Sequence, residues 1–274
     1  MAEIWTPMLA KTWDDVPVKH KKFPLYVQPK INGMRCLKAG SKFYSRTGTP
    51  ILSNPKLEEA VGKIFNGIPL DGELYCHGMT FEENQMLNRP TVNICEDTRM
   101  QYWVFDVCTP DEYQTRMKYL EMLFSVSAHN RVVLVPTTLV KNENELLSTL
   151  NTYISQGYEG IIIRKPGGGY ESKRSFNLMK LKPFKDTEAI VEDFIPGHGK
   201  LSGMVGALRG RLLAPEFGDG RVDVGSGFSD AERIFMWDNK DRVIGQVFTL
   251  QYQEKTKHGV PRFPTFKHFR DLRF

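Results

Sequence analysis

A lysine that follows a strand-like apolar run is the first residue whose setting suggests chemistry. Residues 30–35 (KINGMR) come directly after residues 25–29 (LYVQP), and a glycine stands three positions after Lys30. Glycine lets the backbone lie close to a bound nucleotide. A lysine becomes a nucleophile when desolvation or neighbouring positive charge, such as that of Arg35, removes its proton. Taken alone the pattern is weak, and a solvated surface lysine before a turn is its ordinary interpretation.

Five further short segments carry groups that a nucleotide site would use. They are residues 45–48 (SRTG), 71–74 (DGEL), 102–106 (YWVFD), 159–164 (EGIIIR) and 180–182 (KLK). Each has an ordinary alternative: Phe105 is typical of a core, Glu73 of a turn, and the two lysines of the solvated face of a strand.

The combination of these segments is more specific than any one of them. Nucleotidyl transfer needs a nucleophile, carboxylates for a divalent metal and cations for the α-phosphate in one pocket. Lys180 and Lys182 would project from the same face of a strand. Glu73 and Glu159 each stand at a strand edge, where they could reach the same pocket as Lys30.

Helix and strand signals predict a mixed α and β framework that positions these residues. Asn54 before Pro55 predicts a capped helix start, and residues 110–124 have helical apolar spacing. Another helix is expected from Asn142, with Glu145 in a capping box, to Gly157. Strand-like runs rich in β-branched and aromatic residues occupy 25–29, 43–46, 102–107, 131–135 and 160–164.

A second domain is expected after a hinge near residues 182–186. Short strand-like runs separated by glycine-rich turns follow, with one helical candidate near residues 229–237. This texture is typical of a small five-stranded barrel of the OB type. We therefore predict an α+β protein with a first domain over residues 1–184, containing mixed, largely antiparallel sheets, and an OB-fold β-barrel over residues 185–274.

Composition narrows the class of protein but not its function. The 274 residues are 41% hydrophobic and 25% charged, with a formal charge of +5, which is compatible with a phosphate-rich partner. The four cysteines lie far apart without a C-x-x-C pair, so a zinc site or disulfide framework is not expected. No signal peptide and no apolar run of transmembrane length is seen, so we expect a cytoplasmic protein (in the host cytoplasm if it is viral) with no membrane partner.

The ordered segments resemble the covalent nucleotidyltransferase superfamily of ATP-dependent DNA ligases, RNA ligases and mRNA capping enzymes. That family's motifs are K-x-D-G-x-R, S-R-x-G, D-G-E, an aromatic strand ending F-D, E-G-x-x-x-[KR] and K-x-K, and all occur here in family order. Residues 194–200, 205–208, 224–229 and 261–271 also resemble segments of the ligase OB domain. The resemblance implies a DNA ligase of small size that uses ATP and Mg²⁺ (or Mn²⁺) to seal nicks in double-stranded DNA, with a monomer as the default state.

The resemblance implies the catalytic roles position by position. Lys30 would take AMP as a phosphoramidate, and Lys180 and Lys182 would stabilise charge on the α-phosphate. Glu73 would hold the ribose or a metal ion, and Glu159 a divalent ion.

The same resemblance implies a set of nucleotide-binding residues. Arg35 and Arg46 would contact the sugar or the 5′-phosphate of the nick, and Phe105 would stack on adenine. Arg164, at the end of the E-G-x-x-x-[KR] motif, belongs to this set.

The resemblance also implies roles for the last motif of the family, and the sequence differs from the family pattern at two positions. Arg262 and Arg270 would come from the OB domain when it closes over ATP. Asn32 stands where the family usually has aspartate, and His268 where related small ligases often have arginine. Asparagine is nearly isosteric with aspartate but lacks its charge, so we expect the amine of Lys30 to lose its proton no less easily.

Two other functions fit parts of the sequence. An RNA ligase or a capping guanylyltransferase would share the lysine chemistry, although the OB segment favours a DNA ligase. The alternative of a non-catalytic OB-fold protein that binds nucleic acid is favoured only by Asn32.

Overall fold

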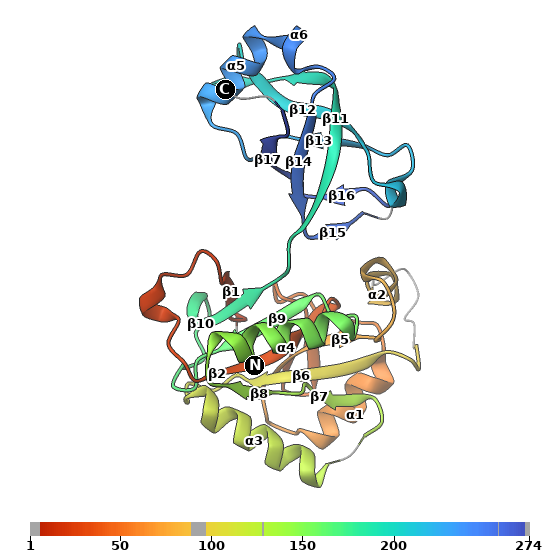
Figure 1. Ribbon diagram of the computed structural model, residues 1–274. Helices are drawn as coiled ribbons and strands as arrows, with labels where there is room; N and C mark the ends of the chain where they lie inside the picture. The colour runs from red at the N-terminus through yellow and green to blue at the C-terminus, as the bar shows by residue number, and fades with distance from the viewer. Residues whose placement is uncertain (1–5, 89–96, 128, 257, 272–274) are drawn as a thin grey trace. The chain divides into compact units, whose positions relative to one another are not determined.

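The chain folds into two compact units, Met1–Lys182 and Pro183–Phe274, whose division falls within the segment predicted as a hinge. A computed structural model describes residues 6–88, 97–127, 129–256 and 258–271 (Figure 1). The boundary after residue 184 itself stays a prediction.

The first unit contains two five-stranded sheets. One has the order β1 (Leu9–Thr12), β10 (Arg174–Leu181), β9 (Gly160–Arg164), β2 (Leu25–Lys30) and β8 (Thr138–Val140). The other has the order β4 (Lys42–Tyr44), β3 (Met34–Ala39), β5 (Leu70–Tyr75), β6 (Gln101–Val107) and β7 (Val132–Leu134). Only the β1–β10 and β6–β7 pairs are parallel, so the prediction of largely antiparallel sheets is confirmed.

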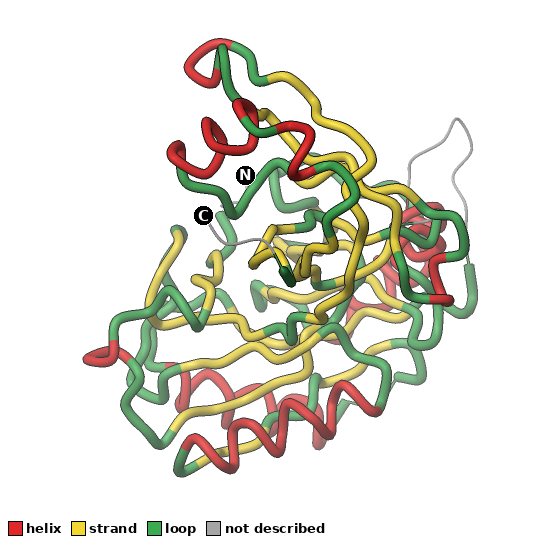
Figure 2. Tube along the Cα trace, turned by 45° about the horizontal axis from the view of Figure 1, so that its top comes forward, coloured by secondary structure: helices red, strands yellow, loops and turns green. Residues whose placement is uncertain are grey.

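Helices cover these sheets because each has one apolar face (Figure 2). Helices α1 (Pro55–Ile64) and α3 (Tyr113–Val126) share a core with β3, β5 and β6, in which Phe65 and Phe124 lie 5.3 Å apart. Helix α4 (Glu143–Ser155) buries Leu146 and Leu150 against β2 and β9. The short helices η1 (Val18–His20) and α2 (Phe81–Asn88) were not predicted.

Local sequence signals predicted the helix ends with one error. Asn142 caps α4 by accepting from Glu145 N at 2.9 Å, and Gly157 follows the helix with a φ of 87°. The prediction that Asn54 caps α1 is wrong. Its backbone is left-handed, and its Oδ1 instead accepts from Asp97 N at 2.9 Å. Its side chain is buried, so it satisfies a tertiary partner rather than the helix.

The second unit contains an antiparallel five-stranded sheet. Its order is β13 (Arg221–Val224), β12 (Val205–Leu212), β11 (Lys185–Pro196), β14 (Val247–Tyr252) and β17 (Thr265–Phe269). Around it lie η2 (Gly199–Leu201), η3 (Pro215–Phe217), α5 (Asp230–Asp238), α6 (Lys240–Val243) and the hairpin of β15 (Glu254–Lys255) and β16 (Pro261–Arg262). A full capping box between Ser229 and Glu232 starts α5.

The predicted barrel requires a correction, because this sheet is OB-like but not closed. Its edge strands β13 and β17 are joined in the described residues by one bridge, between Ser226 and Thr265. The contact is made beyond the end of β13 at Val224: Gly227, with a φ of 94°, lies so close to β17 that a Cβ on it would be 2.3 Å from Phe266 O.

The sequence predicts neither a disulfide framework nor a membrane-spanning helix. Cys36, Cys76 and Cys108 are free thiols there, whereas Cys95 lies outside the described residues. None of the described helices has the length and apolarity to cross a membrane.

Candidate active site

A pocket of about 510 Å³ in the first unit is lined by residues of both sheets. It contains eight of the residues that the sequence singled out: Lys30, Asn32, Arg35, Arg46, Glu73, Phe105, Arg164 and Lys180. A volume of this size is typical of a site that encloses a nucleotide-sized ligand.

Lys30 stands at the end of β2, where it is held by a carboxylate. Its Nζ donates to Glu159 Oε2, and Lys182 Nζ forms an ion pair with Glu159 Oε1. All three side chains are 20% exposed or less. One carboxylate thus holds the two ammonium groups in place.

Strand pairing explains why these groups meet. Lys30 lies opposite Gly160 in the β2–β9 pair, and Glu159 N donates to Lys30 O at 3.2 Å. A Cβ on Gly160 would lie 2.3 Å from Leu181 O, so only glycine allows β9 to approach the K-L-K segment. The pKa of Lys180 is lowered, first by burial and then by the positive charge of Lys30.

Glu73 closes the turn that follows Lys30. Its Oε1 accepts from Gly33 N at 2.7 Å, and a Cβ on Gly33 would lie 2.4 Å from Leu74 O. Burial raises the pKa of Glu73, although the charges of Lys30 and Arg35 oppose this shift. The glycine of the K-x-N-G segment is therefore required by packing against β5 as well as by any ligand.

A buried aspartate aims Arg35 at the pocket. Asp71 accepts from Arg35 Nε at 2.5 Å and from the hydroxyl of Tyr170 at 2.7 Å. The Arg35 guanidinium lies 4.8 Å from the centre of the Phe105 ring. Burial disfavours its charge, but Asp71 outweighs burial and raises the pKa of Arg35. Stacking of Phe105 on adenine stays a prediction.

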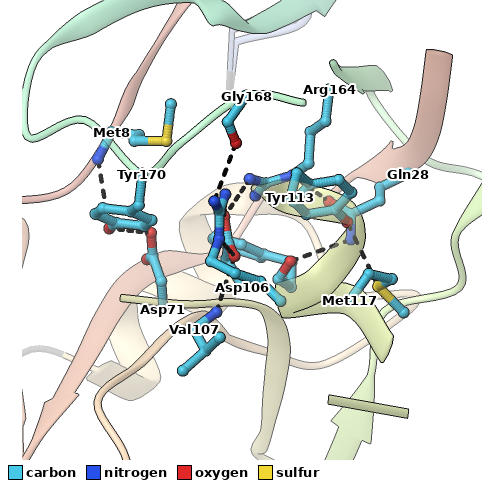
Figure 3. A network of polar contacts seen from close by, with 12 residues as sticks. Met8, Gln28, Asp71, Asp106, Val107, Tyr113, Met117, Arg164, Gly168 and Tyr170 are labelled. Atoms are coloured by element: carbon cyan, nitrogen blue, oxygen red, sulfur yellow. Dashed lines mark hydrogen bonds and ion pairs between the residues drawn. The ribbon is translucent and has the colours of Figure 1, made fainter. Parts of the chain in front are cut away.

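Arg164 belongs to a second buried network (Figure 3). Its guanidinium donates to Gln28 Oε1 at 2.9 Å and pairs with Asp106, which also accepts from Arg116 Nε at 2.7 Å. Asp106 outweighs the effect of burial and raises the pKa of Arg164. Arg164 thus lines the pocket, but its guanidinium N–H groups bond to Gln28 and Asp106. A direct contact between Arg164 and the nucleotide stays a prediction.

The remaining predicted residues lie in other settings. Arg46 lines the pocket from the turn after β4. Arg262 and Arg270 belong to the second unit, where Arg262 lies 5.0 Å from the Phe263 ring and Arg270 Nε donates to Glu188 Oε1 at 2.5 Å. His268 pairs with Thr249 across β14 and β17. Their predicted roles toward ATP stay predictions.

Sequence reasoning missed Gln28, Gln85 and Arg174 among the polar residues of the pocket wall. Gln28 lies two positions before Lys30 on the same face of β2, and its Nε2 donates to Phe105 O at 3.2 Å. The alternation of β2 would have indicated it. Gln85 of α2 donates to Gly33 O at 3.3 Å. No local signal marks Gln85, because the helix that carries it was not predicted.

Glu73 and Glu159 fit a magnesium site that substrate phosphates complete. Both lie near Lys30, since Glu159 pairs with it and its charge acts on Glu73. Among the described residues no group of three or more His, Cys, Asp or Glu side chains could hold an ion. Mg²⁺ is commonly held by one or two carboxylates together with phosphate oxygens, and the assignment of Glu73 and Glu159 to such an ion stays a prediction.

Comparisons with known families agree with this geometry. Residues 7–182 match the ATP dependent DNA ligase domain, and residues 196–270 match the DNA ligase OB-like domain. The DNA ligase of Haemophilus influenzae is 28% identical, with 94% of this chain and 90% of the relative covered. The DNA ligase of African swine fever virus is 30% identical, with 93% of this chain but 66% of the relative covered.

Solved structures show the same fold. A Lig E DNA ligase, described as binding DNA with a minimal scaffold, has a TM-score of 0.77 at 24% identity and covers 98% of this chain and 100% of its own. A Chlorella virus DNA ligase-adenylate has a TM-score of 0.57 at 26% identity, covering 99% and 100%.

Proposed function

The chain belongs to the ATP-dependent DNA ligase family, and we propose that it seals nicks with Lys30 as the residue that carries AMP. ATP is the nucleotide of this family, and a divalent ion such as Mg²⁺ accompanies it. The observation that carries the residue assignment is Lys30, held by Glu159 beside Lys180 in a nucleotide-sized pocket.

The first step is formation of the adduct. Lys30 loses a proton to solvent, its nitrogen attacks the α-phosphorus of ATP, and the bond from that phosphorus to the bridging β-phosphate oxygen breaks with release of pyrophosphate. Lys180 and Lys182 supply positive charge to the α-phosphate. Magnesium, held by Glu73 and Glu159, would neutralise phosphate charge.

Two further steps seal the strand. An oxygen of the nick 5′-phosphate attacks the AMP phosphorus, the P–N bond breaks and Lys30 regains a proton. The 3′-hydroxyl then attacks the adenylated 5′-phosphate, loses its proton and displaces AMP. Arg35 and Arg46 would bind the sugar or the 5′-phosphate, and Arg262 and Arg270 would join from the OB-like unit during adduct formation.

Mass spectrometry of the purified protein tests this assignment. Mixing with ATP and Mg²⁺ is expected to add one AMP, GTP is expected to add nothing, and peptide mapping should find the adduct on Lys30. A protein that takes up no nucleotide with any divalent ion would contradict the assignment. Nicked duplexes with DNA or RNA on the 3′-hydroxyl side then measure which strand is preferred. The monomeric state and a cytoplasmic location stay predictions, the first checked by sedimentation.

Asn32→Asp is expected to retain adduct formation. Asn32 lines the pocket in the turn after Lys30, and an added carboxylate there would favour the ammonium form of the lysine. We expect full adduct at equilibrium with a rate lowered by no more than about tenfold, or 1.4 kcal/mol. Quenched-flow labelling with ATP measures it, and complete loss of the adduct would show that asparagine has a role of its own.

Tyr170→Phe is expected to slow AMP transfer to the nick. The hydroxyl donates to Asp71, so its loss loosens the carboxylate that orients Arg35. We expect a loss of about 1.5 to 3 kcal/mol in unfolding free energy and transfer from the preformed adduct slowed about tenfold. Tyr119→Phe, on the exposed side of α3, is the control. Unchanged transfer in a destabilised Tyr170→Phe protein would make the hydroxyl purely structural.

A further inference from the structure

A run of basic residues around η1 is not used by the chemistry described above. Residues 19–22 read KHKK, and Lys19 and Lys22 are exposed. We use "lysine cluster" for Lys11, Lys19, Lys21, Lys22 and Lys165, together with His20.

Contacts around one aromatic ring assemble the lysine cluster from separate segments. The imidazole of His20 stacks on Phe176 of β10 at 4.2 Å with an interplanar angle of 5°. Lys11 Nζ lies 4.2 Å from the centre of the same ring, and Lys165 Nζ lies 3.3 Å from His20 Nδ1. Lys21 Nζ lies 5.0 Å from the Trp13 ring. Packing thus holds Lys11, Lys165 and His20 together, and Lys19, Lys21 and Lys22 follow from the short segment that carries His20.

Their mutual repulsion is incompletely balanced by the protein. The pKa of Lys165 is lowered by burial and by the charge of Lys22, although Glu171 opposes the shift. The pKa of His20 is lowered by burial and then by Lys165, Lys19 and Lys11. Asp14 and Asp15 also lie in this segment and reduce its excess of positive charge. A fold that gathers like charges on its surface gains most from a polyanionic partner.

The cluster lies at the edge of the sheet that carries the nucleophile (Figure 1). Strand β1 is the edge strand, and β10 and β9 separate it from β2. At about 4.8 Å per strand, β1 lies about 14 Å across the sheet from the strand of Lys30. Lys11 is level with Val27, three residues or about 10 Å along β2 from Lys30, so the two lysines are about 17 Å apart in the sheet. Ala10 lines the pocket, while an irregularity after it leaves Lys11 beside Phe176.

We propose that the lysine cluster binds the phosphate backbone of duplex DNA on one side of the nick, about five or more base pairs from the bond that is sealed. The spacing follows from about 17 Å between Lys11 and Lys30 in the sheet and about 3.4 Å per nucleotide along one DNA strand. Lysines that contact phosphates carry no base information, which suits an enzyme that must act at any sequence. The proposal rests on nick sealing as the function.

Salt dependence of binding tests the proposal. The variant Lys19→Gln/Lys21→Gln/Lys22→Gln should bind a nicked duplex about tenfold or more weakly at low salt, and the slope of log K against log salt should fall by about 2 to 3. The matched control removes three lysines from α1 and α3, as Lys56→Gln/Lys63→Gln/Lys118→Gln, and should keep the wild-type slope. Equal slopes for wild type and cluster variant would overturn the proposal.

Two further measurements locate the contact and separate it from catalysis. Without DNA, the cluster variant should form the AMP adduct at the wild-type rate. That rate reports on the nucleotide pocket independently of the DNA-binding measurement. With the wild type, shortening one duplex arm below about five base pairs should weaken binding, and the cluster variant should be insensitive to that arm. A variant as sensitive as the wild type to both arms would refute the position.

Discussion

Lys30→Arg is expected to abolish the covalent AMP adduct and multiple-turnover sealing. Arginine can keep the charge and the partnership with Glu159, but its guanidinium is not deprotonated in proteins and cannot supply a free electron pair. We expect adduct formation to fall by at least about 10⁴-fold, the scale on which loss of a catalytic nucleophile acts. Labelled ATP and intact-mass measurement check the result.

A second substrate separates loss of the nucleophile from loss of the fold. A nicked duplex that already carries AMP on its 5′-phosphate needs only attack by the 3′-hydroxyl, so Lys30→Arg should still seal it. Lys141→Arg, an exposed lysine before α4, should behave as wild type in both assays. An adduct on another lysine of the Lys30→Arg protein would show that the nucleophile has been assigned to the wrong residue.

Asp106→Asn is expected to give the largest loss of stability. The side chain of Asp106 is 0% exposed and bonds two guanidinium groups, those of Arg116 and Arg164, which are 1% and 3% exposed. The nearly isosteric amide would leave two buried cations without a counter-charge. Breaking such a pair costs about 3 to 5 kcal/mol, a large share of the 5 to 15 kcal/mol typical of a folded domain.

Thermal and urea unfolding of the full chain, followed by the signal of the first unit, measure this effect. Glu59→Gln removes a carboxylate from an exposed pair with Lys63, and should leave the unfolding free energy nearly unchanged because solvent screens that pair. The double change Asp106→Asn/Arg116→Met should cost less than the sum of the single changes, because one stranded cation is removed with the anion. Strict additivity would mean that the two groups do not depend on each other.

Much of this protein could be predicted because its signals are local. The strand alternation around Lys30, the cap at Asn142 and the glycine after α4 depend on neighbours within a few positions. The order of the short motifs likewise indicated the nucleotide site before any fold was known. The error at Asn54 arose because the prediction used local signals alone. The buried side chain of Asn54 accepts a hydrogen bond from Asp97 N, and not from an N–H group of the helix that follows it.

Local signals were therefore enough to predict the class of fold, several helix ends and eight of the residues that line the pocket. Which charges meet depends on the tertiary structure. The order of strands brings Lys30 beside Glu159 across 129 positions, and directs the donors of Arg164 to Asp106. It also gathers the lysine cluster around Phe176 and leaves the OB-like sheet open. The physical reason is that ion pairs and sheet closure depend on three-dimensional distance, which strand order sets and local propensity does not.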